Sequence, residues 1–136
     1  MTRTPDTSVV VAGLCAWHPD HEVALPELAG RPIVVAHVLV ESYSVLTRLP
    51  HNQRVKPELA AAALAAAFAE RAVAMTGPEI RTLIDLLARS GVHGGAAYDA
   101  VIAATARRHE LTLVTLDARA ATTYDVIGVE TEFLSR

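Results

Sequence analysis

Cysteine is nearly absent from this chain, and its scarcity limits the chemistry open to the protein. Cys15 is the only cysteine among 136 residues, which excludes an internal disulfide and a cysteine-rich zinc site. The six histidines are scattered, and no two are four residues apart, so a histidine zinc site is also disfavoured. Lys56 is the only lysine and lies in a polar loop. A receiver domain, which also gathers acids at one edge of a parallel sheet, needs a lysine at the end of its last strand and is therefore disfavoured.

Long hydrophobic runs and an excess of positive charge are missing too. The apolar stretches are too short to cross a bilayer, and residues 1–12 lack the layout of a signal peptide. We therefore expect a soluble cytoplasmic protein with no membrane partner. The net charge of −3 argues against a protein that coats DNA. It does not exclude a nuclease, because a bound cation restores positive charge locally.

The residues that are present alternate between short apolar runs and helical patterns. The length suits one domain over residues 1–136. We predict strands at 2–6, 31–36, 71–76, 111–117 and 129–134. We predict helices at 9–16, capped by Thr7 or Ser8, and at 20–30, 37–49, 57–70, 77–91 and 96–110, with a short one after 117. This alternation predicts an α/β fold in three α/β/α layers, with a parallel sheet covered on both faces. Ligands of such sheets bind beyond the carboxyl ends of the strands.

Four of the 15 acidic residues lie where acids are unexpected. Asp6 and Asp117 end the first and fourth predicted strands. Glu41 and Asp99 lie in early turns of helices, on faces that are otherwise apolar. Carboxyl ends of parallel strands and the starts of the following helices share one edge of a sheet, so these acids are expected to converge there.

Each acid also has a structural interpretation. Asp6 and Asp117 suit the N-cap position of a following helix. Glu41 fits a surface position if its helix is rotated from the predicted orientation. Asp99 is placed where the helix dipole favours an acid.

Convergence would have a chemical consequence. Four nearby carboxylates cannot all stay ionised without a cation. Oxygen ligands select a hard divalent ion, Mg²⁺ or Mn²⁺. Such an ion takes phosphate oxygens from a substrate and activates water, so the expected chemistry is phosphodiester hydrolysis.

Four segments together resemble the acidic motifs of PIN domains, above all those of VapC-type ribonuclease toxins. They are DTS at 6–8, VLVESYSVLTRLP at 38–50, YDAVIAATARRH at 98–109 and LVTLDARA at 113–120. The resemblance covers essentially the whole chain. It implies a parallel sheet of four to five strands in the order 3-2-1-4-5. It also implies a Mg²⁺- or Mn²⁺-dependent endoribonuclease that cuts tRNA or ribosomal RNA.

The resemblance implies roles for individual residues and for partners. Asp6, Glu41, Asp99 and Asp117 take the acidic, metal-binding and catalytic positions, and Ser8 and Thr115 take supporting hydroxyl positions. A homodimer is implied, as is a VapB-type antitoxin whose C-terminal segment fills the RNA groove. One departure from the family is Ala120, where many relatives have an aromatic residue.

Basic residues near the predicted site are candidates for RNA contacts. Arg119 directly follows Asp117, and Arg48 and Arg54 belong to a basic loop that also suits plain solvation. A haloacid-dehalogenase-like phosphatase is disfavoured because Ser8 stands where its second aspartate is needed. The alternative that remains is a catalytically silent PIN-like module that serves binding or scaffolding.

Overall fold

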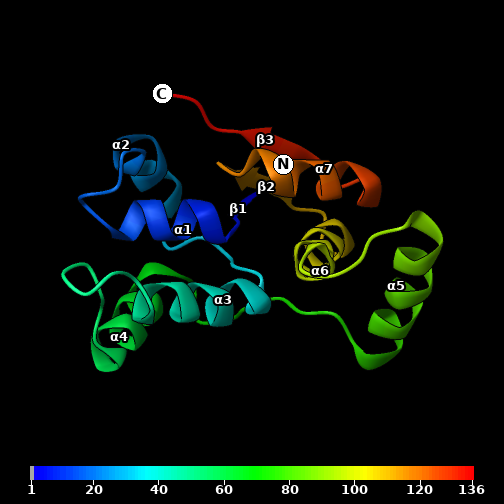
Figure 1. Cartoon of the computed structure of the whole chain (residues 1–136), viewed down its shortest axis with the longest axis horizontal. Helices are drawn as coiled ribbons and strands as arrows, with labels where there is room; N and C mark the ends of the chain where they lie inside the picture. The colour runs from blue at the N-terminus through cyan, green and yellow to red at the C-terminus, as the bar shows by residue number, and fades with distance from the viewer. Residues whose placement is uncertain (1) are drawn as a thin grey trace.

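The sheet of this protein has three parallel strands in the computed structural model, which describes residues 2–136 (Figure 1). The strands are β1 (Arg3–Pro5), β2 (Thr112–Thr115) and β3 (Thr131–Phe133), in the order β1-β2-β3. Thr4 is in register with Leu113. The predicted first and fourth strands are therefore neighbours, as the order 3-2-1-4-5 requires.

Helices account for most of the remaining chain. They are α1 (Thr7–Leu14), α2 (His21–Ala24), the 3₁₀ helix η1 (Leu25–Leu28), α3 (Ala36–Thr47), α4 (Pro57–Ala67), α5 (Gly77–Ser90), α6 (Ala96–Arg108) and α7 (Ala118–Ile127). Helices α1, α6 and α7 all contact β2, and α3 packs against both α1 and α4. Helix α5 lies at the edge of the molecule beside α6 (Figure 1). No helix within residues 2–136 has the length and apolar character needed to cross a membrane.

The predicted sheet of four to five strands is wrong in extent. Segments 31–36 and 71–76 meet only through one parallel bridge, between Val35 and Val73. The bridge is held by a hydrogen bond of 2.8 Å from Ala36 N to Val73 O. Val35 and Val73 are buried, so these apolar segments lie in the core as predicted. They do not pair as regular strands, however.

Proline explains why the ladder stops at β1. Asp6 N donates to Val114 O on the β2 side at 2.9 Å, and successive residues of a strand face opposite edges. Pro5 therefore faces the other edge, where it has no N–H to offer. Only the side chain of Thr4 reaches across on that side, donating from Oγ1 to Ile33 O at 2.8 Å.

The start of α1 also differs from the prediction. Thr7 and Ser8 were expected to cap this helix, but the N-cap is Asp6, whose Oδ1 accepts from Val9 N at 3.2 Å. The backbone of Asp6 is still extended, with φ −84° and ψ −179°, whereas Thr7 is already helical. Because α1 begins almost directly after β1, the single residue between them becomes the cap, and that residue is also the first of the four acids.

A continuous apolar core joins the sheet to the helices. Its largest fully buried members include Phe68, Ile102, Leu113 and Tyr124. Ile102 comes from α6, Leu113 from β2 and Tyr124 from α7, so the fourth predicted strand shares one packed interior with the helices before and after it. Packing of this kind holds the strand ends at fixed positions.

Candidate active site

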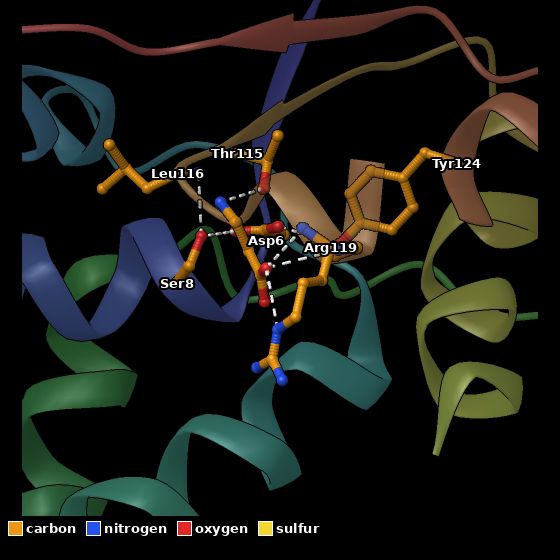
Figure 2. Close-up of polar contacts among 8 residues, drawn as sticks. Asp6, Ser8, Thr115, Leu116, Arg119 and Tyr124 are labelled. Carbon is orange, nitrogen blue, oxygen red and sulfur yellow. Dashed lines mark hydrogen bonds and ion pairs between the residues drawn. The ribbon is translucent and has the colours of Figure 1, made fainter. Parts of the chain in front are cut away.

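Asp6 is a buried carboxylate with a complete set of donors. Only 2% of the residue is exposed. Its Oδ1 accepts from Ser8 Oγ at 2.5 Å and from Val9 N, and its Oδ2 accepts from Tyr124 OH at 2.8 Å (Figure 2). Burial raises the pKa of the Asp6 carboxyl, and the hydrogen bonds from these donors oppose that shift.

Ser8 ties the end of β1 to the end of β2. Its Oγ donates to Asp6 and accepts from Leu116 N at 2.9 Å (Figure 2). Thr115, which is fully buried, accepts from Asp117 N at 3.0 Å through Oγ1. The two hydroxyl residues expected to support the acids therefore bond to the strand ends that carry Asp6 and Asp117.

Asp117 is the N-cap of α7. Its Oδ1 accepts from Arg119 N at 2.9 Å and from Ala120 N at 3.3 Å. The Arg119 guanidinium lies 3.9 Å from the same oxygen, but the Arg119 side chain is 97% exposed, so this ion pair is weak. The structural interpretation of Asp6 and Asp117 as helix caps is thus correct, and it coexists with their placement at the strand ends.

Glu41 and Asp99 approach from two other helices. Glu41, on α3, pairs with His37 one turn earlier, at 3.6 Å between Oε2 and Nε2. The His37 ring stacks on Tyr98, the residue before Asp99 on α6. Glu41 is only partly exposed, and Asp99 shares its helix with the buried Ile102, as predicted.

The pKa of Asp99 reports that the acids are close together. Partial burial, followed by the charges of Glu41, Asp117 and Asp6 in that order, raises it from 3.8 to about 6. Only Arg119 acts in the opposite direction. Asp99 is therefore surrounded mainly by negative charge, which is the condition expected of converging carboxylates.

A cavity of about 740 Å³ opens where these helices and strand ends meet. We call it the acidic cavity, and its polar lining consists of Thr7, Ser8, His18, Asp20, Glu41, Arg48, Asp99, Asp117 and Arg119. Asp6 does not line it and lies beside Ser8. Arg54 does not line it either, since its Nε donates to Leu49 O in the loop after α3.

The chemistry of this donor set fits a hard divalent cation. All four acids offer oxygen, and Thr7 adds a buried Oγ1 that has no hydrogen-bond partner within residues 2–136. No three His, Cys, Asp or Glu side chains of the described part of the chain lie close enough to hold a metal ion together. Three of the acids turn instead to other partners: Asp6 to its donors, Glu41 to His37 and Asp117 to the start of α7.

Tyr124 is the residue that sequence reasoning missed. Its hydroxyl donates to Asp6 although 118 positions separate them, and burial raises the pKa of this phenol, which keeps its proton. A signal was available, because Tyr124 lies seven residues after Asp117 and so falls on the same side of a helix.

Comparison with known proteins finds a matching family and named relatives of this chain. The PIN domain family matches residues 4–126. Ribonuclease VapC40 of Mycobacterium tuberculosis is 43% identical over 131 residues, covering 96% of this chain and 98% of the relative. Ribonuclease VapC27 of the same organism is 40% identical over 125 residues, covering 91% and 90%.

Solved structures with low sequence identity share the fold. The sarcin-ricin loop cleaving toxin VapC20 of Mycobacterium tuberculosis superposes with a TM-score of 0.67 at 23% identity, over 89% of this chain and 94% of that one. A chain of FitAB bound to a DNA fragment superposes with a TM-score of 0.70 at 20% identity, over 99% of both chains.

Proposed function

The chain belongs to the PIN-domain family as a VapC-type ribonuclease toxin, and from that premise we propose a metal-dependent mechanism centred on Asp6, Glu41, Asp99 and Asp117. The observation that carries the proposal is that Glu41, Asp99 and Asp117 line one cavity, where burial and the charges of the other three acids raise the pKa of Asp99. A site that accumulates negative charge in this way is one that a divalent cation stabilises.

The four carboxylates are proposed to hold Mg²⁺ or Mn²⁺ at the acidic cavity. When bound, the ion supplies a polarised water and stabilises charge at the scissile phosphate. The chain contributes the geometry around it. Ser8 and Thr115 hold the two strand-end acids in place, while Glu41 and Asp99 approach from α3 and α6.

RNA is proposed to reach the acids across a basic rim. Arg119 and Arg48 both line the acidic cavity, and Arg119 is almost fully exposed. Guanidinium groups there can bind the phosphates on either side of the scissile bond. We propose tRNA or ribosomal RNA as the substrate class, with VapC20, named as a toxin that cleaves the sarcin-ricin loop, as the precedent.

Two protein partners are proposed as well. We propose that a VapB-type antitoxin binds this chain and blocks its site, as the likeness to VapC40 leads us to expect. We also propose that the chain acts as a homodimer and that residues 1–136 form one domain.

Loss of one carboxylate tests the activity. We expect the wild-type chain, expressed alone, to inhibit bacterial growth, and Asp6→Asn or Asp99→Asn to abolish the inhibition. With purified protein the same substitutions should slow RNA cleavage by a factor of about 100 or more, since each removes charge stabilisation from the site. Mapping new 5′ ends in cellular RNA after induction identifies the substrate.

Asp125→Asn is the matched control, because Asp125 is an exposed acid on α7 outside the acidic cavity. It should leave growth inhibition and cleavage unchanged. Equal toxicity of the wild type and Asp99→Asn would contradict the proposal.

A catalytically silent binding module is the second candidate. It is favoured by the structural partners that Asp6 and Asp117 already have as helix caps. Calorimetry with Mn²⁺ separates the two, because a silent module should show no binding that Asp6→Asn removes.

A further inference from the structure

The carboxylate of Asp6 has little freedom left to it. An ionised carboxylate offers about four lone-pair positions, all of them acceptors. Ser8 Oγ and Val9 N take both positions on Oδ1, and Tyr124 OH takes one on Oδ2. The Thr115 side chain is a further hydrogen-bond partner of this carboxylate, so little of its acceptor capacity is left.

Helix α7 connects the two strand-end acids. Asp117 caps its first turn, and Tyr124 lies two turns later with its hydroxyl on Asp6 (Figure 2). Ser8 binds the opposite oxygen from α1. The Asp6 carboxylate is thus held between two hydroxyls, one from Ser8 on α1 and one from Tyr124 on α7. Ser8 belongs to one of the four acidic motifs, and Tyr124 lies outside them.

Burial limits what Tyr124 can do. Only 1% of the residue is exposed, so it cannot touch RNA. Its ring is part of the core, where phenylalanine would occupy nearly the same volume. The hydroxyl is thus the one feature that distinguishes tyrosine from phenylalanine at this position, and its one hydrogen bond goes to Asp6 Oδ2 at 2.8 Å.

We propose that Tyr124 is a positioning residue, whose hydroxyl fixes the orientation of the Asp6 carboxylate for the cation site. This inference rests on the proposed metal-dependent function. Partners that hold a metal ligand from behind change metal affinity by about 10- to 100-fold when they are removed. Without the hydroxyl, Oδ2 loses its donor and the carboxylate can rotate about its bond to Cβ.

The test compares Tyr124→Phe with Thr123→Val. Thr123 is the adjacent buried residue on α7, so its substitution also removes a buried hydroxyl from this helix. We expect Tyr124→Phe to bind Mn²⁺ about tenfold more weakly by calorimetry. The Mn²⁺ concentration for half-maximal cleavage should rise by the same factor, while KM for RNA stays unchanged. Thr123→Val should bind Mn²⁺ as the wild type does.

Asp6→Asn makes the two possible failures distinguishable. If the wild type binds Mn²⁺ and Asp6→Asn does not, the metal site stands, and equal Mn²⁺ affinity of Tyr124→Phe and wild type overturns the positioning role alone. If the wild type and Asp6→Asn behave alike, the proposed metal site fails and the positioning role falls with it. A tenfold loss shared by Thr123→Val would show a general effect on α7 and would also overturn the inference.

Fluorine NMR covers the case in which Tyr124→Phe does not fold. The chain has three tyrosines, so labelling with 3-fluorotyrosine gives three signals, which Tyr43→Phe and Tyr98→Phe assign. Saturating Mg²⁺ should shift the Tyr124 signal in the wild type and leave it in place in Asp6→Asn. An unmoved Tyr124 signal in the wild type overturns the inference.

Discussion

At the scale of single residues, charge rather than shape distinguishes the acids of this site. Asp99 has Glu41, Asp117 and Asp6 as its main charged neighbours, and only Arg119 offsets them. Asp6 is shielded by three hydrogen bonds, whereas Asp99 depends on the cavity for its solvation. Burial raises the pKa of both Asp6 and Asp99, so a bound cation would favour the ionised form of each.

Stability of the metal-free protein should fall as the pH rises through the pKa of Asp99. A carboxyl with a folded-state pKa of about 6 and an ordinary value of 3.8 holds its proton more tightly in the folded state. Folding is then favoured at pH 5 relative to pH 7. Urea unfolding in EDTA at both pH values measures this contribution. Asp99→Asn should reduce the difference between the two pH values, and an unchanged difference in that variant would refute the role of Asp99.

At the scale of elements, two helices start on acids of the site. Asp6 caps α1 and Asp117 caps α7, so each carboxylate stabilises a helix and also lies at a strand end. An N-cap side chain contributes about 1 kcal/mol to stability, and asparagine serves in that position nearly as well as aspartate. The two roles of Asp117 can thus be separated by the choice of replacement.

Asp117→Ala and Asp117→Asn should differ in stability but agree in activity. Alanine removes the bonds to Arg119 N and Ala120 N, so we expect it to lower the free energy of unfolding by about 1 kcal/mol relative to asparagine. Both should lose RNA cleavage, because both remove the negative charge. Chemical denaturation and a cleavage assay supply the two measurements. Retained cleavage in Asp117→Asn would mean that Asp117 serves only as a cap.

At the scale of the whole molecule, the net charge of −3 opposes attraction of a polyanion. Under the proposed function, we therefore expect local positive charge to bring RNA to the acids. Arg119 and Arg48 line the acidic cavity, and Arg108, on α6, is instead paired with Glu79 at 2.7 Å. The rim of the cavity is the surface where phosphate contacts matter most.

The RNA affinity of an inactive variant should fall as the salt concentration rises, and the arginines at this rim should contribute to that dependence. In the Asp6→Asn background, Arg119→Ala should reduce the slope of log affinity against log salt by about 0.7, the value for one contact to a single-stranded phosphate. Arg81→Ala removes an exposed arginine from α5 and serves as the matched control, with no change in slope. Equal slopes for Arg119→Ala and its parent would contradict a phosphate contact by Arg119.

The order of the helices and the proximity of the four acids could be predicted from the sequence. Apolar periodicity located every helix, and the acids after the first and fourth strands were recognisable because carboxylates are rare beside buried segments. Strand extent was not predictable in the same way. Segments 31–36 and 71–76 are apolar enough for strands, but a ladder also needs donors on both edges, and Pro5 removes one from β1.

Tertiary structure alone decided how the acids are held. Periodicity describes which residues face the core, and it says nothing about which buried polar groups meet there. The bonds from Tyr124 to Asp6 and from Leu116 N to Ser8 join residues more than 100 positions apart. Such partners are selected by the packing of α7 and α1 around the strand ends, because a buried carboxylate is stable only where the folded chain brings donors to it.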